Sequence, residues 1–259
     1  MLGFRAEIAA AALAVCLAGP AAACIVAQSS LTAYPGSVTS GPGLTAWYDD
    51  PVTRYPHFVL GRQHEPETLW VDLPGNHGTC GHALTLPGDY VFEDTAPRPV
   101  DLDGDGLAEV VTVRSHRELG AQLAVYGWRD GALELIAEGH HIGQARRWLA
   151  IAAVADLDGD GAVEIAWVDR PHLAKVLRIW RWTGAGLEEL ARVEGVTNHR
   201  IGDPGIAGGL RDCGPGPEIV LATADWSGLV AVRLGEDVGV ERLDGRPDAA
   251  GFAGALDCR

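Results

Sequence analysis

The stretch Asp101-Leu-Asp-Gly-Asp-Gly-Leu-Ala-Glu109 occurs a second time in the chain, as Asp156-Leu-Asp-Gly-Asp-Gly-Ala-Val-Glu164. Both copies place Asp at the first, third and fifth positions and Glu at the ninth. Four carboxylates this close together repel each other in a folded chain unless a cation lies between them. Ca²⁺ suits such a loop, because it is a hard ion that takes roughly six to eight oxygen ligands in a flexible arrangement. The pattern therefore predicts two calcium-binding loops, and an acidic hairpin without an ion is the alternative.

The expected ligands are the four carboxylates of each loop and the backbone carbonyl at its seventh position. They are Asp101, Asp103, Asp105, Leu107 and Glu109 in the first loop, and Asp156, Asp158, Asp160, Ala162 and Glu164 in the second. The glycines between the aspartates allow the tight curl that turns alternate side chains inward. We therefore expect calcium as the cofactor, at two sites.

Both loops are expected to join two strands. An EF-hand has its bidentate Glu at the twelfth loop position and a helix on each side, whereas the Glu here is at the ninth. Runs rich in β-branched residues follow directly, at 109–113 and 164–168, and mostly apolar stretches precede, at 97–100 and 149–155. Such runs are typical of strands. The unit is therefore strand, calcium loop, strand.

These units belong to a repeat that covers most of the chain. Segments 57–61, 109–113, 164–168 and 218–222 align with separations of 52, 55 and 54 residues. Two further sets of strands follow them, at 68–73, 122–126, 176–182 and 229–234, and at 132–137, 187–193 and 238–243. Four short strands in each unit of about 50 residues are typical of a β-propeller blade. We expect an all-β fold, a small β-propeller of four four-stranded blades, or five if residues 25–55 contain an irregular blade.

The last segment of the chain is expected to close this ring. Residues 251–258 resemble the leading strands at 150–156 and 206–213, so they would complete the first blade. Closure would remove the exposed edges of an open sheet. The same alignment places Cys213 and Cys258 at equivalent points of neighbouring blades, where a disulfide could form if their Cα atoms lie within about 7 Å.

The other two copies of the loop lack the calcium pattern. At 210–218 only Asp212 and Glu218 stand at ligand positions, and Arg211 lies beside them. In the first copy the glutamate position holds His57, and the loop residues would be Asp257 and Cys258. We expect no calcium at either place.

With this repeat established, the chain resembles the FG-GAP/VCBS family of calcium-binding propeller repeats, which also occur in integrin α-chain propellers. The matching residues are 101–111 and 156–166, with Asp-x-Asp-Gly-Asp-Gly followed by an acid and apolar β-formers. The chain is also similar to secreted bacterial proteins that carry such repeats. The resemblance implies a propeller fold, Ca²⁺ in the hairpin between the first two strands of a blade, and an extracytoplasmic location. An adhesion role like that of the integrin propeller rests on fold analogy alone.

The N-terminus predicts export. Residues 1–23 are interpreted as a signal peptide with cleavage after Ala23, and residues 24–45 as a leader or linker before a propeller at 46–259. Lipidation of Cys24 is the alternative to a soluble secreted or periplasmic protein. No other segment is long and apolar enough to cross a membrane. The net charge of −15 argues against nucleic acid or an anionic membrane surface as the partner.

Cysteine parity agrees with export. Cys16 leaves with the signal peptide, and Cys24, Cys80, Cys213 and Cys258 remain, an even number in an oxidising compartment. Three pairings are open. We favour Cys213–Cys258 from the alignment, which gives Cys24–Cys80 by elimination.

Polar and aromatic residues are predicted to gather on the face opposite the calcium loops, because they follow the far ends of the strands. The candidate ligand residues on this face are His64, His116, His172, Arg147, Trp148, His199, Arg200 and Trp226. Convergent polar and aromatic groups suit a ligand site, although ordinary solvated turns give the same pattern. A three-histidine metal site is a further alternative. Trp128, Trp180 and Trp182 are expected to pack in the sheets.

The sequence favours a binding or interaction module with structural Ca²⁺, whose partner would be a protein or a carbohydrate. The alternative is an extracytoplasmic hydrolase or lyase acting on a polysaccharide through Arg147, Trp148, His172 and His199. No nucleophile elbow, phosphate loop or dinucleotide fingerprint occurs in the sequence, so no catalytic residue is assigned and enzymatic activity is left open.

Overall fold

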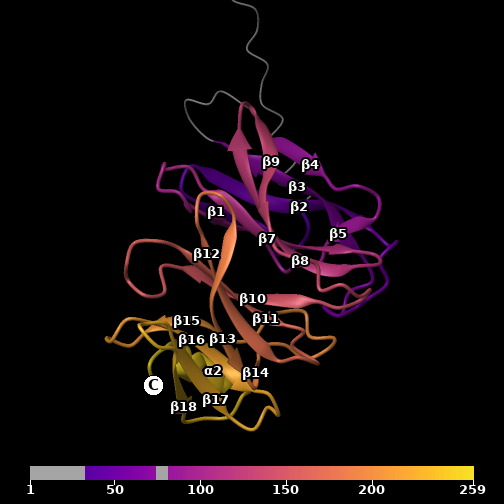
Figure 1. Cartoon of the computed structure of the whole chain (residues 1–259). Helices are drawn as coiled ribbons and strands as arrows, with labels where there is room; N and C mark the ends of the chain where they lie inside the picture. Colours follow the sequence, from indigo (N-terminus) through magenta and orange to yellow (C-terminus); the bar gives the residue numbers. More distant parts are fainter. Residues whose placement is uncertain (1–32, 74–80) are drawn as a thin grey trace, which may run out of the picture.

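The computed structural model describes residues 33–73 and 81–259. These residues form four antiparallel sheets that follow one another along the chain, together with one short helix, α2 (Figure 1). Each sheet is one blade, so the predicted all-β propeller of four blades is confirmed. The sheets are called blades 1 to 4 in chain order.

Blades 1 and 2 contain the first nine strands. Blade 1 has the order β1 (Thr39–Gly41), β2 (Leu44–Val52), β3 (Glu65–Asp72) and β4 (His82–Thr85). In blade 2, β5 (Tyr90–Phe92) and β6 (Arg98–Val100) both pair with β7 (Glu109–His116), which is followed by β8 (Gly120–Arg129) and β9 (Ala132–Glu138).

Blades 3 and 4 contain the remaining strands. Blade 3 has the order β10 (Leu149–Ala155), β11 (Glu164–Asp169), β12 (Val176–Trp182) and β13 (Leu187–Glu194). In blade 4, β14 (Val196–Thr197) and β15 (Gly209–Asp212) both pair with β16 (Pro217–Thr223), which is followed by β17 (Leu229–Arg233) and β18 (Gly239–Leu243).

The middle strands of blades 2 and 3 carry apolar side chains on both faces, because each of these blades packs between two others. Successive side chains of a strand point to opposite faces. Val110 of β7 therefore lies in the core between blades 1 and 2, and Val111 lies in the core between blades 2 and 3. In β11, Ile165 packs towards blade 2 and Ala166 towards blade 4. Each interface is thus a layer of interdigitated aliphatic and aromatic side chains.

The leading strands contact one another in succession, β1 with β6, β6 with β10, and β10 with β15. This is the arrangement of the inner strands of a propeller. In blades 2 and 4 the leading strand is split into two short pieces, and the residues between the pieces leave the sheet. These segments, 93–97 and 198–208, carry polar side chains of the site described below.

The C-terminal segment does not form the closing strand that the sequence suggested. Residues Ala249–Leu256 form α2, which contacts β15 and β16 through a core that includes Phe252 and Ala255 (Figure 1). Asp248 caps the helix by accepting a hydrogen bond from the Gly251 amide, and the alanines of the segment favour helix over strand. The outer face of blade 4 is therefore covered by a helix.

Blade 1 begins earlier than expected. Residues 57–61 are a loop, because Phe58 has a φ of +58°, which a strand cannot accommodate. The second strand of blade 1 is β2 instead, and β1 lies inside the segment 24–45 that was expected to be a leader. The loop 101–108 also reaches blade 1, since the Ala108 amide donates to the Pro42 carbonyl.

Several expectations fall on residues outside the described ranges. They are the signal peptide at 1–23, lipidation of Cys24 and the Cys24–Cys80 disulfide. Among the described residues, no helix has the length and the hydropathy that crossing a membrane requires.

Candidate functional site

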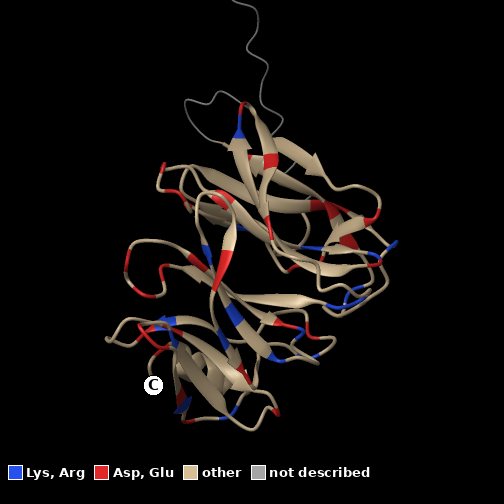
Figure 2. Ribbon diagram, viewed as in Figure 1, with Lys and Arg blue, Asp and Glu red and all other residues tan. Residues whose placement is uncertain are grey.

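The two acidic loops, Asp101–Glu109 and Asp156–Glu164, each connect the first two strands of a blade, as predicted. The first lies between β6 and β7 and the second between β10 and β11 (Figure 2). In the first loop, Asp101 accepts hydrogen bonds from the amides of Gly104 and Gly106, at 2.8 and 2.9 Å. Gly106 has a φ of +89°, a conformation that favours glycine. These bonds curl the loop around its aspartates.

The curl brings carboxylate oxygens together. One oxygen each of Asp101, Asp103 and Glu109 lie within 4.8 Å of one another, and Asp156, Asp158 and Glu164 repeat this geometry. Oxygens that share one Ca²⁺ at about 2.3–2.6 Å can be at most about 5 Å apart. Both clusters therefore fit a divalent cation held by oxygen.

The glutamate of each cluster is buried at the base of its loop. Glu109 accepts a hydrogen bond from the Leu102 amide at 2.9 Å, and Glu164 accepts one from the Leu157 amide at 2.8 Å. Burial raises the pKa of both carboxyls, and the amide bonds oppose that rise. Each glutamate thus has one oxygen fixed to the backbone, and its other oxygen contacts an arginine of the same blade.

The remaining predicted ligands are not part of these clusters. Asp105 and Asp160 are exposed, and each accepts a hydrogen bond from the amide two residues later. Their carboxylates and the carbonyls of Leu107 and Ala162 stay predictions as calcium ligands.

A column of arginines, which the sequence analysis missed, lies against the glutamates. Arg181 of β12 contacts Glu164 at 2.6 Å and both Asp158 and Asp160 at 2.8 Å. Arg129 of β8 makes looser contacts, at 3.2 Å to Asp103 and 3.3 Å to Glu109. These guanidinium groups neutralise part of the charge of the acidic loops.

In blade 4 a turn stands in place of the acidic loop, and an arginine side chain supplies the positive charge. Arg211 of β15 lies opposite Glu218 of β16, and its Nη2 is 2.8 Å from that carboxylate. Arg233 of β17 contacts the other oxygen of Glu218.

The structure also contains the Cys213–Cys258 disulfide, with a Cα–Cα distance of 5.6 Å. The geometric reason given for that pair was wrong, because Cys258 follows α2 and not a strand of a neighbouring blade.

A family model described as FG-GAP-like repeat matches residues 101–167, the part of the chain that contains both acidic loops. The chain carries an FG-GAP-like repeat. No curated protein matches the chain.

Among solved structures, the chain is similar to an exo-beta-1,3-galactanase from Phanerochaete chrysosporium, in a crystal structure with beta-1,3-galactotriose. The identity is 9% and the TM-score 0.44. The similarity covers 82% of this chain and 50% of the galactanase, so the chain spans about half the length of that protein.

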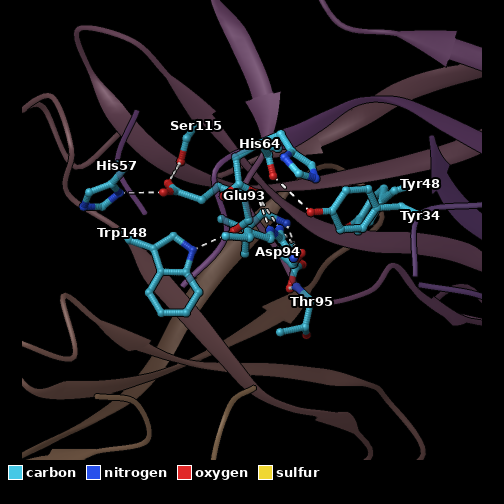
Figure 3. A network of polar contacts seen from close by, with 12 residues as sticks. Tyr34, Tyr48, His57, His64, Glu93, Asp94, Thr95, Ser115 and Trp148 are labelled. Atoms are coloured by element: carbon cyan, nitrogen blue, oxygen red, sulfur yellow. Dashed lines mark hydrogen bonds and ion pairs between the residues drawn. The ribbon is translucent and has the colours of Figure 1, made fainter. Parts of the chain in front are cut away.

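The far ends of the strands in the FG-GAP-like repeat lead to a second polar region, centred on Glu93 between β5 and β6 (Figure 3). The Glu93 side chain is fully buried. It contacts His57 Nδ1 at 2.5 Å and accepts a hydrogen bond from Ser115 Oγ at 2.6 Å. Its backbone carbonyl accepts a hydrogen bond from Trp148 Nε1 at 2.6 Å. Because both carboxylate oxygens are occupied, Glu93 holds the His57 ring in one orientation.

Asp94 anchors the same segment to blades 1 and 2. Its carboxylate forms an ion pair with Arg98 at 2.7 Å and accepts a hydrogen bond from the Val113 amide at 3.0 Å. Its carbonyl accepts a hydrogen bond from Arg62, whose Nε also lies 2.9 Å from Glu65. Burial raises the pKa of Glu65 to about 8, although Arg62 opposes the shift. These contacts give a rigid polar core beneath His57.

Three of the predicted ligand residues meet in one place. His172 Nε2 is 2.9 Å from His199 Nδ1, and both rings pack against Trp148. His199 Nε2 donates to the Asp203 carbonyl at 2.9 Å, so in neutral His199 the Nδ1 atom accepts from His172. Burial, with a smaller effect of His199, lowers the pKa of His172 to about 4. The pair is neutral at physiological pH.

A small pocket lies beside this pair. Its walls include His57, Arg146, Arg147, Arg170 and His172, and its volume is about 30 Å³. Arg146 and Arg170 both have positive φ values, +54° and +42°. Such conformations cost energy in residues other than glycine and concentrate at functional sites. The pocket brings positive charge together in an otherwise acidic protein.

The other predicted ligand residues lie in separate groups. Arg200 stacks over the Trp226 ring at 4.1 Å. His116 packs against Tyr90 and His141, and His64 packs against Tyr34. Across residues 33–73 and 81–259, groups of three metal-ligating side chains occur only in the two acidic loops. The three-histidine metal site is therefore wrong.

His57 and Ser115 were not predicted from the sequence as members of this region. His57 was placed in a strand, and no local pattern marks a buried Glu–His contact between segments 36 residues apart. The arginine column did leave a signal, since Arg129, Arg181 and Arg233 recur 52 residues apart, close to the repeat period.

Proposed function

We propose that this protein is an extracytoplasmic β-propeller binding module in which two Ca²⁺ ions hold the loops at Asp101–Glu109 and Asp156–Glu164. The observation that carries the proposal is the pair of equivalent clusters, each with three carboxylate oxygens within 4.8 Å. The loops lie in the part of the chain that matches the FG-GAP-like repeat. An oxygen-only ligand set of this charge is the chemistry that Ca²⁺ prefers.

The role of the ion would be structural. Each loop is a hairpin whose carboxylates repel one another, and the single arginine beside each cluster compensates only part of that charge. A cation that binds the folded state alone stabilises it by RT ln(1 + [L]/Kd), or about 2.7 kcal/mol per site at a hundredfold excess over Kd. Two sites would therefore contribute about 5 kcal/mol, a large part of the stability of a typical domain.

The test is a calcium titration by isothermal calorimetry together with thermal unfolding in calcium and in chelator. We expect two ions per chain and a higher midpoint with calcium. Asp158→Asn should lose one ion, whereas Asp237→Asn, an exposed residue of the turn between β17 and β18, should keep both. A chain that binds no calcium and unfolds at the same temperature in chelator would contradict the proposal.

Export is part of the same proposal. The predicted signal peptide at 1–23 supports it, and so does the Cys213–Cys258 disulfide, since structural disulfides persist in oxidising compartments. Mass spectrometry of the mature protein from the producing cell should find an unmodified N-terminus at Cys24. A lipid-modified Cys24 would mean that the exported protein is anchored to a membrane and not released. A mature protein that retains residues 1–23 would contradict export.

A second candidate function, hydrolysis or elimination on a polysaccharide, is favoured by the His57 arrangement. A buried carboxylate fixes His57 Nδ1. The Nε2 atom is then left to exchange a proton with a substrate in the pocket, which His172 and the arginines also line. The pocket volume of about 30 Å³ restricts it to a water molecule or one small group of a substrate. Release of reducing ends or unsaturated products by the wild type and not by His57→Ala would support this candidate. Failure to release either from a panel of polysaccharides would remove it.

A further inference from the structure

A cavity lined by aromatic and polar side chains lies between blades 2 and 3, away from the acidic loops. Its volume is about 420 Å³, within the usual range of about 300–1,000 Å³ for small-molecule sites. Strands β11, β12 and β13 form one wall, and residues 140–142, which follow β9, form the other. We call it the tryptophan pocket, after Trp167 and Trp180.

Strand register places its aromatic and polar side chains on one face. Trp167 and Asp169 are two residues apart on β11, and Arg178 and Trp180 are two residues apart on β12. Trp167 lies opposite Arg178, and Trp180 lies opposite Glu189 of β13. The sheet therefore fixes all of these side chains on the side that faces blade 2.

The two indole rings form a corner. Their centroids are 5.5 Å apart and their planes are 75° apart. Trp167 is 6% exposed, whereas Trp180 is half-buried and lines the cavity. A rigid aromatic corner offers apolar surface in two directions at low cost in conformational entropy. Trp180 thus lines the cavity in addition to packing against the core, which the sequence predicted.

The polar groups of the pocket hold one another in place. Arg178 contacts Glu189 at 2.5 Å and Asp169 at 3.4 Å, and Asp169 also pairs with Arg170 at 2.7 Å. Glu189 accepts a further hydrogen bond from Trp180 Nε1 at 3.1 Å. Fixed donors and acceptors of this kind bind directionally, because they lose little freedom when a ligand arrives.

The charged groups of the pocket are paired. The two guanidinium groups that line it, of Arg170 and Arg178, contact the two carboxylates, and Glu189 also contacts the exposed Arg192 at 3.2 Å. Burial lowers the pKa of the adjacent His141, which leaves that ring neutral at physiological pH. A charged ligand would find no uncompensated counter-charge, and an anion would also meet the carboxylates. The chemistry favours an uncharged ligand with hydroxyl groups on one side and C–H surface on the other.

We propose that the tryptophan pocket binds a neutral saccharide unit, with the sugar's C–H face against Trp180 and its hydroxyls on Arg178, Asp169 and Glu189. This inference rests on the proposed function as a binding module and names the class of its ligand.

The experiment uses the full mature chain, saturated with calcium. Uncharged trisaccharides of glucose, galactose, mannose and xylose are titrated to about 10 mM by calorimetry and by tryptophan fluorescence, with a galacturonic acid trisaccharide as the anionic comparison. We expect one neutral sugar to bind with a Kd of about 1 mM or tighter, and Trp180→Ala to weaken it at least tenfold. Trp128→Ala, a tryptophan of β8 outside the pocket, should bind as the wild type does.

Because Trp180→Ala also removes packing from the core, Glu189→Gln and hydrogen exchange of the wild type provide independent readouts. The neutral sugar should slow exchange at 164–189, and Glu189→Gln should weaken its binding with an unchanged unfolding midpoint. Binding of the anionic sugar alone, an equal loss in Trp128→Ala, or protection elsewhere would overturn the inference. Absence of any sugar binding while two calcium ions still bind would also overturn it and leave the calcium proposal standing.

Discussion

The acidic loops of blades 2 and 3 and the corresponding turn of blade 4 each surround a buried glutamate, but with different side chains. In all three blades a buried glutamate stands where the second strand begins, at Glu109, Glu164 and Glu218. Blades 2 and 3 surround it with aspartates, and the resulting charge favours a divalent ion. Blade 4 has lost most of the aspartates and places Arg211 beside its glutamate.

From this difference we expect that the hairpin needs a positive charge, which a metal ion or a side chain can supply. Two arginines compensate Glu218, and burial is outweighed by their hydrogen bonds, which lower its pKa. The disulfide from Cys213 to Cys258 then joins this turn to the end of α2. Blade 4 should therefore be stable without calcium, and blades 2 and 3 should not.

The largest effect in this comparison is expected from the disulfide. It encloses a sequence separation of 45 residues, for which the chain-entropy model gives a loss of about 4 kcal/mol on removal. We expect the double variant Cys213→Ser/Cys258→Ser to lose about that much in urea unfolding, equally with and without chelator. A loss of stability confined to the calcium-bound protein would show that the disulfide and the calcium loops are coupled, which would contradict the comparison.

A slightly smaller effect is expected at Arg211. Arg211→Met leaves the buried Glu218 with Arg233 alone, and breaking a buried pair costs about 3 kcal/mol. Adding Glu218→Gln should recover at least half of this loss in urea unfolding, because the unpaired charge is then gone. A double variant no more stable than Arg211→Met would mean that Arg211 acts through its hydrogen bond to Ala255 instead.

The third prediction concerns the arginine that neighbours a calcium cluster. Arg181 contacts three carboxylates of the second loop, so its charge should oppose Ca²⁺ there. We expect Arg181→Met to tighten calcium binding roughly tenfold, or about 1.4 kcal/mol, when Asp103→Asn has disabled the first loop. Arg242→Met on the exposed β18 is the matched control. Unchanged or weaker binding in calorimetry would make Arg181 a positioning group.

The smallest effect is a pH dependence of blade 4. Because the arginines lower the folded-state pKa of Glu218 below its usual value near 4.5, the stability it contributes is present above that value and is lost as the pH falls through the folded-state pKa. In chelator, Glu218→Gln should therefore lose less stability than the wild type between about pH 5 and pH 3. Glu241→Gln, on the exposed strand β18, should follow the wild type. Parallel curves for Glu218→Gln and the wild type would contradict the prediction.

Strands that are encoded by a local run of residues could be predicted from the sequence, and elements that depend on distant contacts could not. The strands at 109–113, 164–168 and 176–182 follow from runs of β-branched and aromatic residues, and they occur in β7, β11 and β12. The helix at 249–256 was missed because its small apolar residues match the leading strands, while its N-cap lies just outside the compared segment. The strand expected at 57–61 failed because the backbone conformation of Phe58 has no sequence signal.

The candidate sites divide in the same way. Carboxylates within nine residues are brought together by one loop, so the sequence by itself determined both acidic clusters and the repeat around them. It left four or five blades open, and the sheets of the structure are four. The contact of His57 with Glu93, the packing of His172 and His199 on Trp148, and the tryptophan pocket join residues from different blades. Only the tertiary structure decided these, because the packing of one blade on the next sets which loops and strand faces meet, and no spacing along the chain encodes that packing.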